Sequence, residues 1–277
     1  QQGWSAGTLV GLVLIAAGLG FKVAAVPFHM WTPDVYEGAP TPVTAFVSVA
    51  SKAAGFVLLI RLFSLGLMPA IESWGPLLQL LAAVTMTVGN LLAIQQRNIR
   101  RLLAYSSIGQ AGYLLMGAAF LSESTVNGIL LHLVGYTFTG LAVFLCVTVY
   151  QNLTGAEELE GYAGMAQRSP LLALGMTMSL FSLAGLPLFA GFTTKFYLFT
   201  AVAGHGGLGL VALAVVNSLI SLYYYLRVVR QIYIAEPADA GRLAVPRGVG
   251  TALVALLVLV APASTTAPTT TRTARCR

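Results

Sequence analysis

Apolar residues fill most of the chain in long continuous runs that are separated by short polar stretches. Because a membrane-spanning helix needs about 20 mainly apolar residues, the runs predict transmembrane helices. Eight segments follow from this pattern: 6–29, 43–67, 74–96, 100–121, 125–150, 169–203, 207–234 and 249–262. The runs are continuous rather than alternating, which excludes a membrane β-barrel. With such short connections, the pattern predicts a single all-α, polytopic helical bundle.

The composition supports a membrane location and argues against nucleic acid as a partner. Hydrophobic residues make up 57% of the chain and charged residues 9%, whereas soluble domains carry about 25% charged residues. The net charge is +6, but the basic residues lie at the ends of apolar segments rather than among stacking aromatics on one face. We therefore interpret these residues as determinants of orientation in the bilayer.

The arginines fall in alternate loops, which predicts the orientation of the bundle. One set of loops holds Arg97, Arg100, Arg101, Arg168, Arg227, Arg230, Arg242 and Arg247. The loops near Glu72, near Glu123 and at 204–207 contain no Lys or Arg. Because basic loops stay on the cytoplasmic side, the arginine-rich loops are expected to face the cytoplasm of a multi-pass protein.

Three lysines, Lys22, Lys52 and Lys195, lie within the apolar segments and are the first candidate functional residues. A charge near the bilayer centre costs at least about 2.5 to 3.5 kcal/mol, so such residues either reach an interface or face protein and water. Burial favours the neutral form of lysine, which allows it to gain and lose a proton near neutral pH. Intramembrane lysines are therefore candidates for proton transfer.

Polar positions also recur at helical spacing and predict three buried stripes. The stripes are Ala45, Ser48, Lys52 and Gly55; Gly128, His132, Tyr136 and Thr139; and Asn217, Ser221 and Tyr224. Each should face other helices rather than lipid. For the third stripe we favour interhelical hydrogen bonding alone. For His132, a packed histidine and a proton carrier remain alternatives.

Two segments are expected to contain a broken helix. The 35 residues of 169–203 would form a helix of about 52 Å, longer than the roughly 30 Å hydrocarbon core, and Pro187 lies eight residues before Lys195. Pro27 follows Lys22 in the first segment in a similar way. Because proline removes a backbone donor and disrupts the preceding turn, a break near each lysine is predicted. Discontinuous helices of this kind are typical of ion and proton transporters.

The sequence gives no sign of redox or hydrolytic chemistry in this chain. Cys146 lies in an apolar run and Cys276 in a polar tail, and the three histidines are widely separated, so neither a metal site nor a bound cofactor is expected. Phosphate loops, nucleophile elbows and haem motifs are missing from the sequence. The chain starts without Met and close to its first helix, so it is expected to be part of a longer protein. Residues 265–277 form a low-complexity tail.

Four stretches, FKVAAVPFHMWTPDVYEGAPTPV, SVASKAAGF, QQRNIRRLLAYSSIGQAGYLLMG and LFSLAGLPLFAGFTTKFYLF, resemble subunit N of bacterial NADH-quinone oxidoreductase, respiratory complex I. The likeness runs in order from about residue 6 to 235. It implies an antiporter-like fold of fourteen helices with two inverted repeats. Residues 1–264 would then be one transmembrane domain, with a partial first repeat at 6–67, a second repeat at 74–234 and a last helix at 249–262.

The resemblance also assigns roles to particular residues. Lys22, Lys52 and Lys195 match the proton-transfer lysines of the family's seventh, eighth and broken twelfth helices, while the partner glutamate belongs to a fifth helix that this chain does not contain. Gln110 stands where many members have histidine, and Leu188 where the family often has a second proline. Leu188 is expected to make the break near Pro187 less pronounced, and Gln110 is expected to remove one titrating group.

The resemblance implies a subunit of a proton-translocating NADH:quinone oxidoreductase in a bacterial cell membrane. Its partners would be the other membrane subunits, the lipid bilayer, protons and water, and the whole complex would use NADH, FMN, iron–sulfur clusters and quinone. Three alternatives remain: a subunit of a multisubunit cation/proton antiporter, a plastid-type NAD(P)H dehydrogenase subunit, and a membrane scaffold that does not pump.

Overall fold

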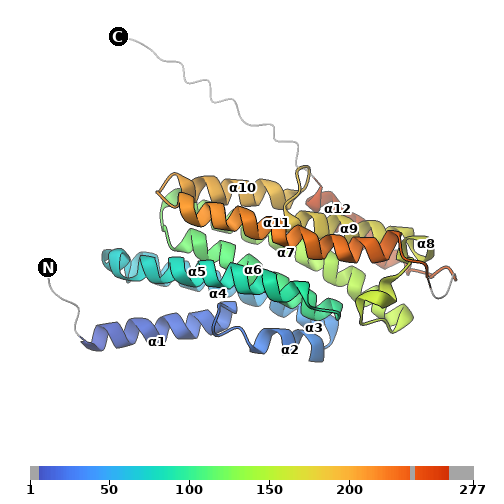
Figure 1. The fold of residues 1–277 in the computed structure, drawn as a ribbon, viewed down its shortest axis with the longest axis horizontal. Helices are drawn as coiled ribbons and strands as arrows, with labels where there is room; N and C mark the ends of the chain where they lie inside the picture. Colours follow the sequence, from blue (N-terminus) through green and yellow to red (C-terminus); the bar gives the residue numbers. More distant parts are fainter. Residues whose placement is uncertain (1–5, 238–240, 262–277) are drawn as a thin grey trace, which may run out of the picture.

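The computed structural model describes residues 6–237 and 241–261, and within these ranges the regular structure is helical apart from one isolated bridge between Asn98 and Glu158 (Figure 1). The predicted tail, with Cys276, lies outside the described residues. The α-helices are α1 (Ala6–Val23), α2 (Trp31–Gly38), α3 (Thr41–Phe46), α4 (Lys52–Leu65), α5 (Ile71–Ile94), α6 (Ile99–Ala118), α7 (Glu123–Thr154), α8 (Met165–Arg168), α9 (Pro170–Ala184), α10 (Ala190–Ala203), α11 (Leu208–Tyr233) and α12 (Arg247–Val260). A π-helical turn, η1 (Val47–Ser51), joins α3 to α4, and 3-10 turns occur at η2 (Met68–Ala70) and η3 (Leu159–Tyr162).

Every predicted segment contains a helix, which confirms the all-α membrane fold. Four helices of the described chain are long and apolar enough to cross a membrane: Thr41–Leu65, Trp74–Ile94, Glu123–Thr154 and Leu208–Tyr233. Val10–Val23, Pro170–Ala184 and Gly248–Val260 are shorter apolar helices. The division of the chain into repeats stays a prediction.

Helix α6 lies in the middle of the bundle and is buried along most of its length. It packs closely on α5 because glycines remove side chains from the contact. A Cβ at Gly112 would lie 2.5 Å from the backbone nitrogen of Met86, and a Cβ at Gly89 would lie 2.7 Å from the nitrogen of Gly109. Such small-residue contacts are typical of helix pairs in membranes, where close van der Waals packing drives association.

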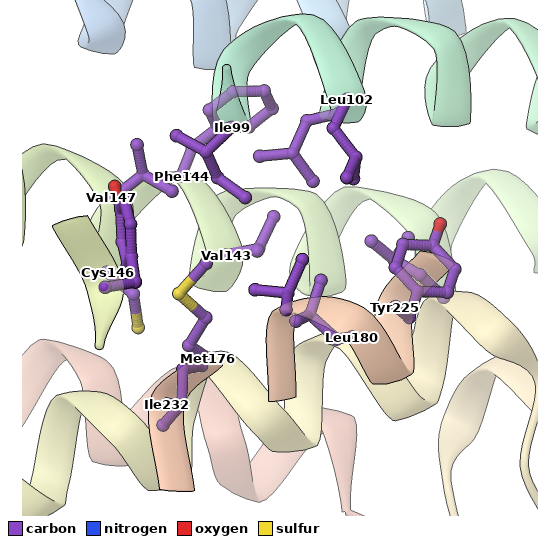
Figure 2. Close-up of a cluster of buried hydrophobic side chains, with 14 of the residues drawn as sticks. Ile99, Leu102, Val143, Phe144, Cys146, Val147, Met176, Leu180, Tyr225 and Ile232 are labelled. Atoms are coloured by element: carbon purple, nitrogen blue, oxygen red, sulfur yellow. The ribbon is translucent and has the colours of Figure 1, made fainter. Parts of the chain in front are cut away.

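An apolar cluster joins α6 to the helices that follow it (Figure 2). Figure 2 shows Ile99 and Leu102 of α6 next to Phe144 of α7, with Met176 and Leu180 of α9 on the other side of α7. All of these side chains are at most 2% exposed. The packing fixes α7 between α6 and α9, and these three helices carry many of the buried polar groups described below.

The first predicted segment, 6–29, is interrupted close to Lys22, as the position of Pro27 predicted, and its helix ends earlier than the apolar run. Helix α1 stops at Val23, and Ala24 takes a positive φ of 62° before the short helix α2 begins at Trp31. Lys22 is therefore in the last turn of α1, although it was expected well inside a segment. The stretch 24–30 is apolar enough to continue a hydropathy run, but its backbone turns.

The long segment 169–203 is divided as predicted. Helix α9 ends at Ala184, Gly185 adopts a left-handed φ of 82°, and α10 begins at Ala190. Glycine accepts this conformation without a Cβ penalty, so Gly185 ends α9 as a C′ residue. The break at 185–189 includes Pro187 and lies just before Lys195 on the next helix.

Two arginines in the first turn of α6 tie several elements together at one end of the bundle. Arg101 binds Asp34 at 2.9 Å and Glu37 at 2.6 Å, both on α2. Arg100 is nearly buried and donates to Glu157 at 2.8 Å and to the carbonyl of Ala39 at 3.1 Å. In Figure 1, α2, α3 and α8 gather at this end.

We expect Gln95, between α5 and α6, to face the cytoplasm, because this connection is rich in arginine. Met68 lies before α5 in a connection without Lys or Arg, so it should face the opposite side of the membrane. Both side chains are exposed and suit cysteine labelling. In a background where Cys146 is alanine and Cys276 is serine, an impermeant maleimide should label Met68→Cys in intact cells. It should label Gln95→Cys only in inverted vesicles, and the reverse pattern would overturn the orientation.

Candidate functional site

Lys52 is buried at the start of α4 and is held by α6. Only 3% of the residue is exposed. Its Nζ donates to the backbone carbonyl of Ser107 at 2.9 Å and lies 2.7 Å from Oγ of the same serine. A lysine placed this way satisfies part of its donor capacity within the protein and does not reach an interface. The snorkelling alternative is therefore excluded for Lys52 in this conformation.

The hydroxyl of Ser107 has more acceptors than it can serve at one time. Its Oγ lies 2.7 Å from the carbonyl of Ala104 and 3.3 Å from the hydroxyl of Tyr36. A serine hydroxyl has one hydrogen, which it can donate to either group while accepting from Lys52. Ser107 therefore provides a proton position next to the ammonium that can change without movement of a helix.

Tyr136 of α7 extends the polar interior from α4 toward α9 and α10. Its hydroxyl lies 3.0 Å from Oγ of Ser48, one turn before Lys52. Tyr136 also lines an internal cavity of about 10 Å³, roughly the space that one water molecule needs. The polar residues around the cavity are Gln110, His132, Tyr136, Thr139, Ser182, Thr194 and Lys195. The residues that line the cavity belong to four helices, α6, α7, α9 and α10, so one water there could bridge polar groups of neighbouring helices.

His132 is 3% exposed and has a partner on each ring nitrogen. Nε2 lies 3.3 Å from Oε1 of Gln110, whose amide nitrogen donates to the carbonyl of Leu183 at 3.0 Å. Since this orients the amide oxygen toward the ring, Nε2 of His132 carries a hydrogen. Nδ1 lies 3.0 Å from Oγ1 of Thr194.

Thr194 can accommodate both protonation states of the ring. When His132 is neutral, the threonine hydroxyl donates to Nδ1. When the ring is protonated, the hydroxyl accepts from Nδ1 and turns its hydrogen to the carbonyl of Gly191, 3.2 Å away. The geometry is therefore compatible with a proton carrier at His132, although the packed-histidine alternative uses the same contacts.

Lys195 lies against the end of α9 that the helix break exposes. Nζ donates to the carbonyls of Leu183 at 2.8 Å and Ala184 at 3.2 Å, and to Oγ of Ser218 at 3.2 Å. These carbonyls belong to the last turn of α9, where the helix leaves acceptors free and carries its partial negative charge. The break thus supplies the counter-charge of a lysine that is only 4% exposed.

The neighbours of Lys195 leave it little freedom to move. Nζ lies 4.9 Å from the ring centroid of Tyr113 on α6, and a Cβ at Gly185 would lie 3.0 Å from Cδ of Lys195. Any other residue at 185 would meet both the strained backbone and the lysine stem. Gly185 therefore has two roles at the break.

Lys22 is placed differently from the other two lysines. It is exposed in the described chain, and its aliphatic stem passes over Gly55 of α4, where a Cβ would lie 3.2 Å from Cγ of Lys22. The carbonyl of Phe21 near the end of α1 accepts from Nε1 of Trp31 at 3.1 Å rather than from the lysine. The described residues thus do not bring Lys22 into the buried polar row, and its proton-transfer role stays a prediction.

The three predicted polar stripes face the interior. Ser48, Lys52 and Gly55 are buried and Ala45 is half-buried, while the stripes on α7 and α11 are buried throughout. On α11, Asn217 contacts Asn90 at 3.4 Å and Tyr224 donates to Asn90 at 3.0 Å, as expected for interhelical hydrogen bonding.

Several site residues gave no signal in the sequence. Ser107 and Ser218 contact Lys52 and Lys195 from other helices, Tyr36 contacts Ser107, and no periodic pattern links these residues to their partners. His29 is 6% exposed and neither ring nitrogen has a partner among the described residues; Oγ1 of the buried Thr32 is also unpaired. Buried polar groups of this kind are usually satisfied by ordered water.

Leu188 provides a test of the break itself. Its φ is 81° and its side chain is 75% exposed, so the residue carries backbone strain without a packing benefit. Leu188→Gly should raise stability by about 1 kcal/mol, whereas Leu188→Pro should lower it, because proline requires a φ near −65°. Thermal unfolding of the purified protein measures both. Leu65→Gly, at an equally exposed leucine ending α4, should not stabilise; equal gains at both positions would contradict the strain.

The fold and its interior define a polytopic helical membrane protein with buried lysines beside helix discontinuities. Residues 2–221 match the family described as NADH:quinone oxidoreductase/Mrp antiporter, TM. The chain belongs to this family.

Individual relatives agree with the assignment. NADH-quinone oxidoreductase subunit N of Moorella thermoacetica is 47% identical over 94% of this chain and 55% of the relative. A chain of respiratory complex I from Thermus thermophilus superposes with a TM-score of 0.80 at 34% identity, over 94% of this chain and 57% of that one. A chain of the Mrp complex from Dietzia sp. superposes with a TM-score of 0.80 at 26% identity. The superposition covers 88% of this chain and 46% of that one. The chain thus spans about half the length of the curated relatives it matches.

Proposed function

We propose that this chain is a proton-translocating membrane subunit of a bacterial NADH-quinone oxidoreductase, located in the plasma membrane. The observation that carries the proposal is the row of buried polar residues Lys52, Ser107, Tyr136, His132 and Lys195: Lys52 is bonded to Ser107, and Tyr136, His132 and Lys195 line one small cavity. NADH, FMN, iron–sulfur clusters and quinone would bind to other subunits of the complex. The membrane subunits beside this chain would be its partners.

In this proposal the row moves protons by small rotations of hydroxyl groups. Lys52 and Lys195 hold a proton against backbone carbonyls when charged and release it when their surroundings become less favourable to charge. Ser107 and Thr194 change from donor to acceptor, and Tyr136 passes a hydrogen between Ser48 and a water in the small cavity. The chain itself supplies the path, and redox-linked changes in neighbouring subunits would supply the driving force.

A subunit of a cation/proton antiporter is the second candidate, favoured by the structural likeness to the Mrp complex chain. The two functions differ in what drives transport. In inverted vesicles, proton uptake that requires NADH and persists without sodium supports the oxidoreductase. Sodium-dependent proton exchange in the absence of NADH supports the antiporter.

Removing the hydroxyl of Tyr136 should interrupt the row with little change in shape. We expect Tyr136→Phe to lower NADH-driven proton uptake per assembled complex by roughly tenfold, the effect of about 1.4 kcal/mol lost from one hydrogen-bonded step. Tyr197→Phe, at an exposed tyrosine, is the matched control and should behave like the wild type. Equal uptake in both variants would remove Tyr136 from the path.

A further inference from the structure

A pocket with three arginines lies at the predicted cytoplasmic end of the bundle. It has a volume of about 260 Å³ and is lined chiefly by Arg97, Arg227, Arg230, Glu158, Glu160 and Gln231. Arg97 follows α5, Arg227 and Arg230 belong to the last two turns of α11, and the glutamates lie at η3. The pocket is therefore at the level where the bilayer meets water.

The arginines of this pocket retain unused donors. The ion pairs within the described residues involve Arg100 and Arg101, while Arg227 donates from Nη1 to the carbonyl of Ile94. Neither Glu158 nor Glu160 forms an ion pair within 4.0 Å in this part of the chain. Three arginines and two glutamates leave a net charge of +1. Each guanidinium has five N–H donors, and guanidinium groups bind phosphate oxygens in a bidentate manner.

An exposed apolar face of α11 leads from the pocket into the bilayer. Four apolar residues precede Arg230 on α11 at helical spacing. They are Leu226, Tyr223, Leu219 and Val215, with exposed fractions of 45%, 58%, 65% and 46%. Tyr223 provides an amphipathic ring in the first turns below the arginines, as tyrosines do at membrane interfaces. Figure 1 shows α11 in front of the bundle, and the exposed fractions show that the described residues leave these four side chains largely uncovered.

The apolar face ends at a cleft beside the helix break. The cleft has a volume of about 280 Å³, and its walls include Phe192, Phe196, Leu219, Leu222, Ser218 and Lys195. From Arg230 to Leu219 the helix rises by about 16 Å. One leaflet of a bilayer has a hydrocarbon depth of about 15 Å, so an acyl chain that starts at the arginines would end at the cleft.

We propose that this surface binds one anionic phospholipid of the cytoplasmic leaflet. Its phosphate occupies the pocket of Arg97, Arg227 and Arg230, one acyl chain lies along α11, and the chain end fills the cleft next to Lys195. The opposite charges of pocket and phosphate, and the match between acyl length and helix rise, favour a lipid over a protein partner. The inference uses the membrane assignment and not the proton path.

The test measures lipid binding to the purified complex that contains the full chain. Dioleoyl-phosphatidylglycerol and dioleoyl-phosphatidylcholine are titrated in detergent, and binding is followed by native mass spectrometry. We expect selective binding of phosphatidylglycerol, and a loss of roughly 100-fold in affinity in the Arg97→Gln/Arg227→Gln/Arg230→Gln variant, since each basic side chain contributes about fivefold near an anionic lipid. Glutamine keeps a donor for the carbonyl of Ile94.

Two further variants separate the possible explanations. Arg97→Gln/Arg230→Gln changes only exposed side chains, so it should fold and still lose roughly 25-fold by the same contribution per arginine. Leu222→Trp should fill the cleft and weaken dioleoyl-phosphatidylglycerol without weakening the dihexanoyl form. Arg61→Gln, an exposed arginine on α4, is the control and should bind normally.

Three results would overturn the proposal. Equal binding of phosphatidylcholine would remove the role of the arginines in selecting charge. If millimolar inorganic phosphate displaces phosphatidylglycerol, and if the dioleoyl and dihexanoyl forms bind with equal affinity, the pocket is a site for a free anion. Unchanged lipid binding in the double variant, with loss of a neighbouring subunit from the purified complex, would assign the surface to a protein partner.

Discussion

Replacing Lys195 by arginine should abolish NADH-driven proton pumping while the chain remains assembled. Arginine keeps the positive charge that the carbonyls of Leu183 and Ala184 stabilise, but it does not release its proton in proteins. A relay that depends on release at this position should slow by about 100-fold or more, the usual contribution of a positioned acid or base. NADH oxidation should slow in parallel if pumping and electron transfer are coupled.

The measurement is proton uptake per assembled complex in inverted vesicles, with the amount of chain determined on the same vesicles. Lys195→Ala should also stop pumping, and it leaves two carbonyls without their donor, so it should reduce assembly as well. Arg61→Lys, at an exposed position, is the control for exchange of basic residues. Near-normal uptake in Lys195→Arg, with loss of assembly confined to alanine, would make Lys195 a structural anchor and favour the scaffold alternative.

Gly191→Ala should prevent stable folding of the α9–α10 break. A Cβ at this position would lie 1.8 Å from the carbonyl oxygen of Ser182 and 2.7 Å from its carbon, which is backbone and cannot rotate away. The backbone N–H of Gly191 also donates to Oγ of Ser182 at 3.1 Å, and this hydrogen bond holds α10 close to α9 at the clash. We expect a loss of about 3 kcal/mol or more, the upper range for overpacked positions.

Thermal unfolding and the yield of assembled chain test this prediction together. Gly209→Ala is the matched control, because nothing lies within 4 Å of its added Cβ on α11. Alanine has the higher helix propensity, so the control should equal or exceed the wild type in stability. A Gly191→Ala protein as stable as the control would show that α9 and α10 can separate at the break without cost.

The spans, both helix breaks and two of the buried lysines could be predicted from the sequence. Apolar runs reveal the spans because each helix faces lipid along part of its surface, and Lys52 and Lys195 stand out because charge is rare in such runs. The break near Pro187 followed from length, since 35 residues exceed the thickness of the membrane. The helical spacing of Ser48, Lys52 and Gly55 revealed which side of α4 faces protein.

The partners of these lysines could not be predicted from one sequence. Helix α6 is buried on nearly all sides, so its polar residues show no stripe, and Ser107 could not be assigned to Lys52. The break near Pro27 was predicted, but its start was not: residues 24–30 are apolar even though their backbone turns, and α1 ends one residue after Lys22. The positive φ of Leu188 is set by how α9 and α10 meet, and side-chain chemistry gave no indication of it.

The π-helical turn Val47–Ser51 stores one residue more than an α-helical turn would hold before its hydrogen bond closes. It allows Ser48 to face Tyr136 on α7 while Lys52 faces Ser107 on α6. Deleting one of residues 49–51 would convert this turn to an α-helical one and leave the helix segments on either side in the same register. Ser48 and Lys52 would then be three residues apart instead of four, so they would lose their present directions toward α7 and α6, although the hydropathy of the span would hardly change.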